Sequence, residues 1–254
     1  MKRSPSTAYS TRAPRRWLSA VLVLGLSLSA SATEPAPDAD KNAGESADRK
    51  DRDAKAIYRP PVRGNPRGRV GGGVRGVGAG APVLFSLVPE HTGQTLAEQP
   101  SLFWYLDGAP PPQAAIVFAL TDEAHIDPLI EVELGRPERG GIQRIDLSGR
   151  GVRLAPGTEY EWSVALVVDP ERRSSDVVTV GWIERVEAPA DLPPDVRADV
   201  RRLAASGLWY DALATASDRV AAAPADPAPR VLRNQLLREV GLDFAADPLP
   251  RGGN

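Results

Sequence analysis

The chain has 254 residues, of which 31 are Lys or Arg and 33 are Asp or Glu, so its formal net charge is −2. This balance provides no excess of positive charge for general nucleic-acid binding, which needs clustered basic residues. The absence of cysteine excludes disulfides, thiolate metal sites, haem attachment through cysteine and cysteine nucleophiles.

The first 32 residues have the three parts of a cleavable secretory signal. Five basic residues and no acidic residue precede the apolar run Trp17–Leu28. This run is shorter than the ~20 residues that a membrane-spanning helix needs. Small residues at Ala30–Ala32 predict cleavage after Ala32, and hence a periplasmic or secreted protein. An uncleaved anchor is the alternative, and Arg15–Arg16 leaves both the general secretory and the twin-arginine export routes open.

Cleavage changes the charge of the product. It removes five of the 31 basic residues, so 26 remain against 33 acidic residues and the net charge of residues 33–254 is −7. No later apolar run is long enough to span a membrane. We therefore expect a moderately acidic exported product that binds no nucleic acid and has no transmembrane span after signal cleavage.

Residues 33–82 are predicted to be a tail. The first part is rich in Ala, Pro and charged residues and lacks apolar periodicity, which indicates disorder. From Tyr58 onward Gly, Pro and Arg predict a flexible strap. The G-x-G-x-x-G pattern at 71–76 lacks the flanking strand and helix of a nucleotide site, so no cofactor is predicted. Four strap arginines are candidates for contact with an anionic surface such as lipid headgroups or cell-wall polymer: Arg63, Arg67, Arg69 and Arg75.

Residues 83–187 contain short β-type segments separated by turn residues. The seven predicted segments are Val83–Val88, Ser101–Leu106, Ala115–Leu120, Leu129–Leu134, Ile142–Leu147, Tyr160–Val168 and Val177–Ile183. Seven short strands in about 105 residues predict an immunoglobulin- or fibronectin-like antiparallel β-sandwich.

Aromatic residues refine this prediction. Tyr160 follows a Pro-Gly turn at the spacing of a tyrosine corner, in which the hydroxyl forms a hydrogen bond to backbone a few residues upstream. Trp104, Trp162 and Trp182 each lie inside an apolar strand, so we expect them in the core. Stacking on carbohydrate is the alternative role for these three tryptophans.

Residues 188–243 change to helical periodicity, and residues 244–254 are predicted to be a disordered tail. The predicted helices are Val196–Ser206, Leu208–Ala223 and Ala228–Val240. They resemble one tetratricopeptide-type unit plus the helix that would start the next. One unit cannot bury its apolar faces alone, so we expect these helices to cap the β-domain or to dock on a partner. Candidates for partner binding are Trp209, Tyr210 and Asp211; alternatively, both aromatic residues attach the helices to the β-domain.

Catalytic chemistry finds little support in the sequence. The two histidines, His91 and His125, lie in predicted loops without a second ligand at metal-binding spacing. No G-x-S-x-G or S-x-x-K motif is present. We therefore expect no metal site and no enzyme activity.

Several short motifs follow one another along the chain. They are Tyr58-Arg-Pro-Pro, Arg67-Gly-Arg-Val-Gly-Gly-Gly73, Leu87-Val-Pro-Glu90, Pro100-x-x-Phe-Trp-Tyr105, Tyr160-x-Trp162, Gly181-Trp-Ile-Glu-Arg185 and Gly207-x-Trp-Tyr-Asp-Ala-Leu213. In this order they resemble the bacterial secreted family known as domain of unknown function 928, over Tyr58 to Leu242. The resemblance implies a secreted or periplasmic protein with a β-domain followed by helices, and it supplies no activity, substrate or catalytic residue.

Three functional hypotheses follow. The first is a non-catalytic periplasmic or envelope interaction module, or a sensor accessory, whose partner is an envelope protein. The second is a carbohydrate or cell-wall binding module, which rests on the use of β-sandwiches for that purpose in other proteins. The third is an unrecognised hydrolase.

Overall fold

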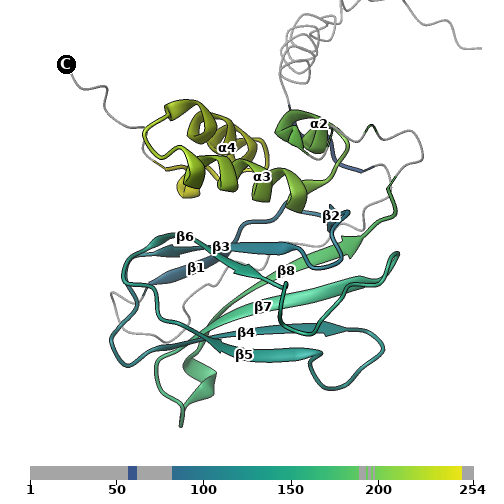
Figure 1. Ribbon diagram of the computed structural model, residues 1–254. Helices are drawn as coiled ribbons and strands as arrows, with labels where there is room; N and C mark the ends of the chain where they lie inside the picture. Colours follow the sequence, from purple (N-terminus) through teal and green to yellow (C-terminus); the bar gives the residue numbers. More distant parts are fainter. Residues whose placement is uncertain (1–56, 62–81, 189–192, 194–195, 197, 248–254) are drawn as a thin grey trace, which may run out of the picture. The chain divides into compact units, whose positions relative to one another are not determined.

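The computed structural model describes residues 57–61, 82–188, 193, 196 and 198–247, which belong to one compact unit (Figure 1). The predicted signal peptide and acidic tail lie outside these residues, as do most of the predicted strap and residues 248–254. Among the described residues, no helix has both the length and the apolar character needed to cross a bilayer.

The β-domain forms two sheets. Its strands are β1 Val83–Ser86, β2 Gly93–Thr95, β3 Ser101–Asp107, β4 Ala115–Asp122, β5 Ile130–Leu134, β6 Gly141–Asp146, β7 Glu159–Val167 and β8 Val177–Arg185. One sheet has the order β1-β3-β6 and the other β2-β8-β7-β4-β5. All seven predicted segments are strands, and β2 is an additional one.

The prediction of a wholly antiparallel arrangement is wrong at β2. This short strand pairs in parallel with β8, with Gly93 opposite Ile183 and Thr95 opposite Arg185. The other strand pairs are antiparallel. Three residues without apolar alternation give no strand signal of their own, so the pairing depends on the surrounding tertiary structure.

Alternation along β7 determines which side chains enter the core. Tyr160, Trp162, Val164 and Leu166 are buried, while the residues between them point to the other face of the sheet. The hydroxyl of Tyr160 accepts a hydrogen bond from the backbone N–H of Ala155 at 2.9 Å. The backward hydrogen bond predicted from the Pro-Gly-x-x-Tyr spacing is therefore confirmed.

The two sheets share one hydrophobic core and are joined along one side. On that side, the backbone N–H of Ser86 in β1 donates to Oγ1 of Thr179 in β8 at 2.8 Å. The hydroxyl of Ser86 donates to the carbonyl oxygen of Val180 at 2.6 Å. These bonds satisfy polar groups that burial would otherwise leave unpaired.

Three α-helices follow the strands. They are α2 Val200–Ala205, α3 Trp209–Ala222 and α4 Pro227–Glu239. The 3₁₀ turn η1 Arg173–Ser175 lies between β7 and β8, and η3 Asp243–Ala245 follows α4. The first helix begins four residues later than predicted, because Asp199 accepts hydrogen bonds from the backbone of Arg201 and Arg202 and acts as its N-cap. Asp226 caps α4 in the same way, with Pro227 in the first turn.

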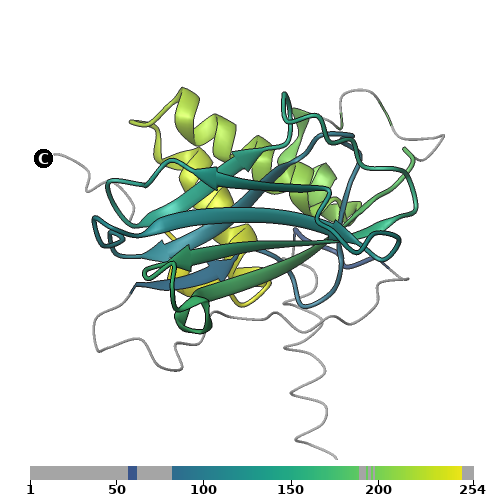
Figure 2. The same cartoon turned by 90° about the horizontal axis from the view of Figure 1, so that it is seen from below.

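Helices α3 and α4 form a third layer over the β1-β3-β6 sheet, and α2 lies above β2 (Figure 1). The five-stranded sheet lies on the opposite side of the molecule, and its outward side faces the viewer in Figure 2. Buried residues of both sheets and of all three helices belong to one cluster. The predicted division at residue 187 therefore separates sequence regions that share a single core.

The predicted limits of the folded region are too narrow at both ends. Ile57 and Tyr58, placed in the flexible strap by sequence, are each only 6% exposed. At the other end Ala245 is buried, and Asp247 exchanges hydrogen bonds with the side chain of Asn234. Both regions are rich in Pro, Gly or charged residues, so their few apolar residues form no periodic pattern that would predict burial.

Candidate binding surface

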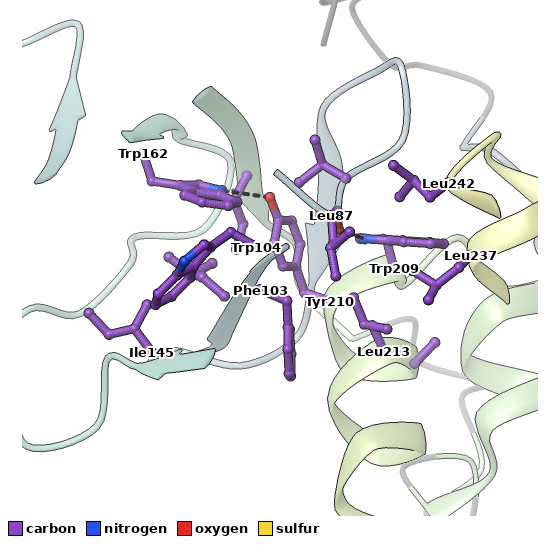
Figure 3. Close-up of a cluster of buried hydrophobic side chains, with 14 of the residues drawn as sticks. Leu87, Phe103, Trp104, Ile145, Trp162, Trp209, Tyr210, Leu213, Leu237 and Leu242 are labelled. Atoms are coloured by element: carbon purple, nitrogen blue, oxygen red, sulfur yellow. Dashed lines mark hydrogen bonds between the residues drawn. The ribbon is translucent and has the colours of Figure 1, made fainter. Parts of the chain in front are cut away.

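The helical layer is attached to the sheets through the first turn of α3. The hydroxyl of Tyr210 accepts a hydrogen bond from the indole N–H of Trp162 and donates one to the carbonyl oxygen of Trp182, each at 2.8 Å. The indole N–H of Trp209 donates to the carbonyl oxygen of Leu87 at 2.9 Å. Figure 3 shows Tyr210 reaching toward Trp162, while Trp209 lies beside Leu237 and Leu242. Burial raises the pKa of the Tyr210 phenol, which therefore stays neutral.

Two glycines make room for these aromatic rings. A Cβ atom on Gly93 would lie 2.7 Å from the ring of Tyr210, and one on Gly181 would lie 2.5 Å from the ring of Trp162. Both distances are shorter than packed carbon atoms tolerate. The close fit requires glycine at both positions.

The structure brings the three candidate partner-binding residues together, but at an internal junction. Trp209 and Tyr210 are at most 1% exposed. Asp211 is half-buried, and its carboxylate accepts a hydrogen bond from the backbone N–H of Leu96 at 2.9 Å. The alternative considered from sequence, attachment of the helices to the β-domain, is what the structure shows for both aromatic residues.

A second attachment involves the segment Ile57–Pro61. The carboxylate of Glu239 in α4 accepts the backbone N–H of Ile57 at 2.9 Å and that of Tyr58 at 2.7 Å. The Tyr58 hydroxyl lies 3.1 Å from Nε2 of His91, and its ring meets that of Trp209 edge-on. Burial raises the pKa of the Tyr58 phenol far above its ordinary value. His91 is thus part of a packed junction rather than a lone surface histidine.

The remaining sequence candidates do not form a reactive centre. Within the described ranges, no three His, Asp or Glu side chains gather in a way that could hold a metal ion. His125 donates from Nδ1 to Asp122 at 2.7 Å in an exposed loop, and this hydrogen bond lowers the pKa of Asp122. The strap residues Arg63, Arg67, Arg69 and Arg75 lie outside the described residues.

The three strand tryptophans divide between the core and the surface. Trp104 is 2% exposed and Trp162 is fully buried, so the prediction of core packing is confirmed for both. Trp182 is only half-buried, because its position in β8 has the parity that points away from the core. The prediction that Trp182 is a core residue is therefore wrong.

The outward face of the five-stranded sheet has short, uncharged side chains at its centre. Strand register places Val180, Ser163, Ala119 and Glu131 in one row across β8, β7, β4 and β5. The next row is Val178, Ala165, Val117 and Glu133. No described helix covers this face in Figure 2.

Acidic residues flank the central residues on two sides. Glu131 and Glu133 lie on the β5 side, and Glu159, Glu161 and Glu184 lie toward one end of β7 and β8. No described strand residue of this outward parity is basic. The outward strand residues of this face therefore carry a net negative charge, which is electrostatically suited to a positively charged partner.

Sequence reasoning identified the strand containing Glu131 and Glu133 but not this surface. The alternation Ile-Glu-Val-Glu-Leu predicts one polar face, and the same period places Glu159 and Glu161 on one face of β7. Which strands are neighbours, and which sheet carries the helices, are set by tertiary structure. The signal present in the sequence was the recurrence of glutamate at alternate positions of two separate strands.

The architecture and this surface define a class of protein: two stacked β-sheets followed by three C-terminal helices, with glutamates on the outward face of the five-stranded sheet. The family described as Domain of Unknown Function (DUF928) matches residues 70–249, and the chain belongs to this family. The match starts later than the resemblance noted in the sequence, so Tyr58 and the first three strap arginines precede it. No curated protein matches the chain.

Proposed function

We propose that this chain is an exported, non-catalytic interaction protein of the cell envelope. Its binding surface is the outward face of the five-stranded sheet, and its partner is a protein with a positively charged contact region. The observation that carries the proposal is the register of short side chains at the centre of this face with glutamates on two sides of them. Short side chains permit close approach of a partner, and the flanking acids select its charge.

The burial of Trp209 and Tyr210 supports this location of the binding surface. Trp209 and Tyr210 are committed to the junction between layers, and the helices cover the outer side of the three-stranded sheet. The five-stranded sheet has no comparable cover among the described elements. A periplasmic sensor accessory is one form of the proposed role.

We also propose two structural relationships, one for the sheets and one for the helices. We propose an immunoglobulin-like relationship for the two sheets, supported by the hydrogen bond from Ala155 to the Tyr160 hydroxyl. We propose a tetratricopeptide-like origin for α2 and α3, supported by the close turn at Gly207, whose φ is +78°. A left-handed residue at the end of a helix is most often glycine, because it has no Cβ.

A carbohydrate-binding role is the second candidate, and it is favoured by one residue. Trp182 is half-buried on the outward face, opposite Glu161 in β7. An indole beside a carboxylate can stack on a sugar ring and accept a hydroxyl hydrogen bond. Quenching or enhancement of tryptophan fluorescence by envelope glycans, abolished by Trp182→Ala, would favour this candidate over a protein partner.

The test is chemical crosslinking in the native envelope fraction, with residues 33–254 as bait. The matched variants are Ser163→Arg, at the centre of the face, and Ala221→Arg, on an exposed position of α3. We expect a saturable protein partner with the wild type and with Ala221→Arg, and its loss with Ser163→Arg. Equal capture by all three baits would contradict the proposed surface. Capture of glycan alone would replace the proposal with the second candidate.

A further inference from the structure

Strand β5 ends the five-stranded sheet. It pairs with β4 through Ile130–Leu134, and it is the terminal strand in the order of the described strands. A terminal strand carries backbone N–H and C=O groups on its outer side that can pair with a further strand. The edge of β5 therefore continues the proposed binding surface with directional hydrogen-bonding groups.

The two faces of β5 differ in chemistry. Ile130, Val132 and Leu134 point to the core side but are only half-buried, and they pack against the main hydrophobic cluster. Glu131 and Glu133 are exposed on the outward face. A strand added to this edge would extend the apolar row with one set of its side chains and meet the two carboxylates with the other.

A second copy of the chain is a poor occupant of this edge. In an antiparallel pair of two β5 strands centred on Val132, Glu131 of each copy would lie opposite Glu133 of the other. Like charges directly opposite one another destabilise strand pairing. The glutamates therefore act against self-association and in favour of a basic strand.

One described basic side chain interacts with a glutamate of this edge. Among the described basic groups, Arg173 in η1 interacts electrostatically with Glu131, but its guanidinium donates to the carboxylate of Asp176 at 2.6 Å. Glu133 lies opposite Val117 and Glu131 opposite Ala119, so their neighbours on β4 are small or apolar. Basic side chains of an added strand would thus meet carboxylates flanked by uncharged residues.

We propose that the β5 edge binds an extended segment of a partner protein in which basic and apolar residues alternate, by addition of a β-strand. This inference rests on the proposed function and specifies the partner's chemistry. The basic residues lie beside Glu131 and Glu133, and the apolar residues lie beside Ile130, Val132 and Leu134. Backbone hydrogen bonds supply affinity, and the two carboxylates supply selectivity.

The probe is a synthetic seven-residue peptide with alternating Lys and Val, capped at both termini, and the control peptide has Glu in place of Lys. The protein is residues 33–254, as wild type, as Glu131→Lys with Glu133→Lys, and as Glu138→Lys with Glu171→Lys. The last variant makes the same change in net charge at exposed positions outside the strands. Affinity is measured by calorimetry and backbone protection by amide hydrogen exchange.

We expect the Lys peptide to bind the wild type and the control variant equally, and to bind the β5 variant about tenfold more weakly. We also expect new protection at alternate amides of residues 130–134, and no binding of the Glu peptide. Equal affinity for all three proteins, or binding without protection in β5, would overturn the inference. If the native partner is still lost with Ser163→Arg while the peptide gives no β5 protection, the proposed function stands and only the strand-addition inference fails.

Discussion

The indole N–H of Trp162, at the centre of the five-stranded sheet, lies 2.8 Å from the hydroxyl oxygen of Tyr210 in the first turn of α3. The same hydroxyl donates to the carbonyl oxygen of Trp182. One phenol therefore satisfies a donor and an acceptor from two strands of the five-stranded sheet. The layers are joined by directional bonds as well as by apolar contact, which fixes how the helices sit on the β-domain.

Replacement of Tyr210 by Phe should lower the free energy of unfolding by about 1–3 kcal/mol, because a buried indole N–H and a carbonyl oxygen lose their shared partner. Urea unfolding measures the change. Tyr105→Phe is the control, since Tyr105 is only half-buried. Equal stability of the two variants would show that the bonds at Tyr210 contribute nothing measurable.

Replacement of Gly181 by Ala should cost about 1–3 kcal/mol, since the added methyl group would overlap the buried ring of Trp162. Gly135→Ala is the matched control, because nothing lies within 4 Å of its added Cβ. Thermal unfolding followed by circular dichroism compares the two. A Gly181→Ala protein as stable as Gly135→Ala would contradict the close fit of ring and strand.

Replacement of Tyr58 by Ala should lower stability by about 3–5 kcal/mol, the usual cost of deleting a buried aromatic side chain. The structure predicts this loss although the surrounding sequence has the composition of a flexible segment. Arg59→Ala is the control, as Arg59 is exposed and donates to Ala204 through its backbone. If Tyr58→Ala unfolds at the same urea concentration as Arg59→Ala, the segment does not contribute to the core.

Alkaline pH should destabilise the protein through Tyr58 and Tyr210. Burial raises the folded-state pKa of both phenols, so the folded protein holds two protons that the unfolded chain loses above pH about 10. The stability that they contribute is complete below this pH and decreases as the pH rises beyond it. Urea midpoints measured across this range should fall more steeply for the wild type than for Tyr210→Phe. Parallel curves would contradict burial of the Tyr210 phenol.

The sequence predicted the elements more fully than their arrangement. Period-two patterns such as Tyr160–Leu166 identified the strands, and the Pro-Gly spacing before Tyr160 identified a specific hydrogen bond. The short strand β2 was missed because Gly93–Thr95 has no apolar alternation. Its pairing with β8 depends on contacts that only the folded protein provides.

The candidate site was harder to predict, because parity along a strand does not say which face is covered. Trp182 and Trp162 lie in similar apolar runs, yet one points outward and the other into the core. Trp209 and Tyr210 look like exposed anchors in sequence because adjacent residues on a helix point in different directions. In the structure the first turn of α3 lies between the β-domain and the neighbouring helical segments, so the side chains of Trp209 and Tyr210 are both buried.

The bond between Glu239 and the backbone of Ile57 and Tyr58 has a consequence for biosynthesis. The two partners are separated by 182 and 181 residues, nearly the full length of the folded region. A growing chain cannot close this contact until α4 has been synthesised, so its core stays incomplete during almost all of translation. Such long-range closure slows folding. A transport system that needs an unfolded chain would therefore have time to engage this protein before its final structure forms.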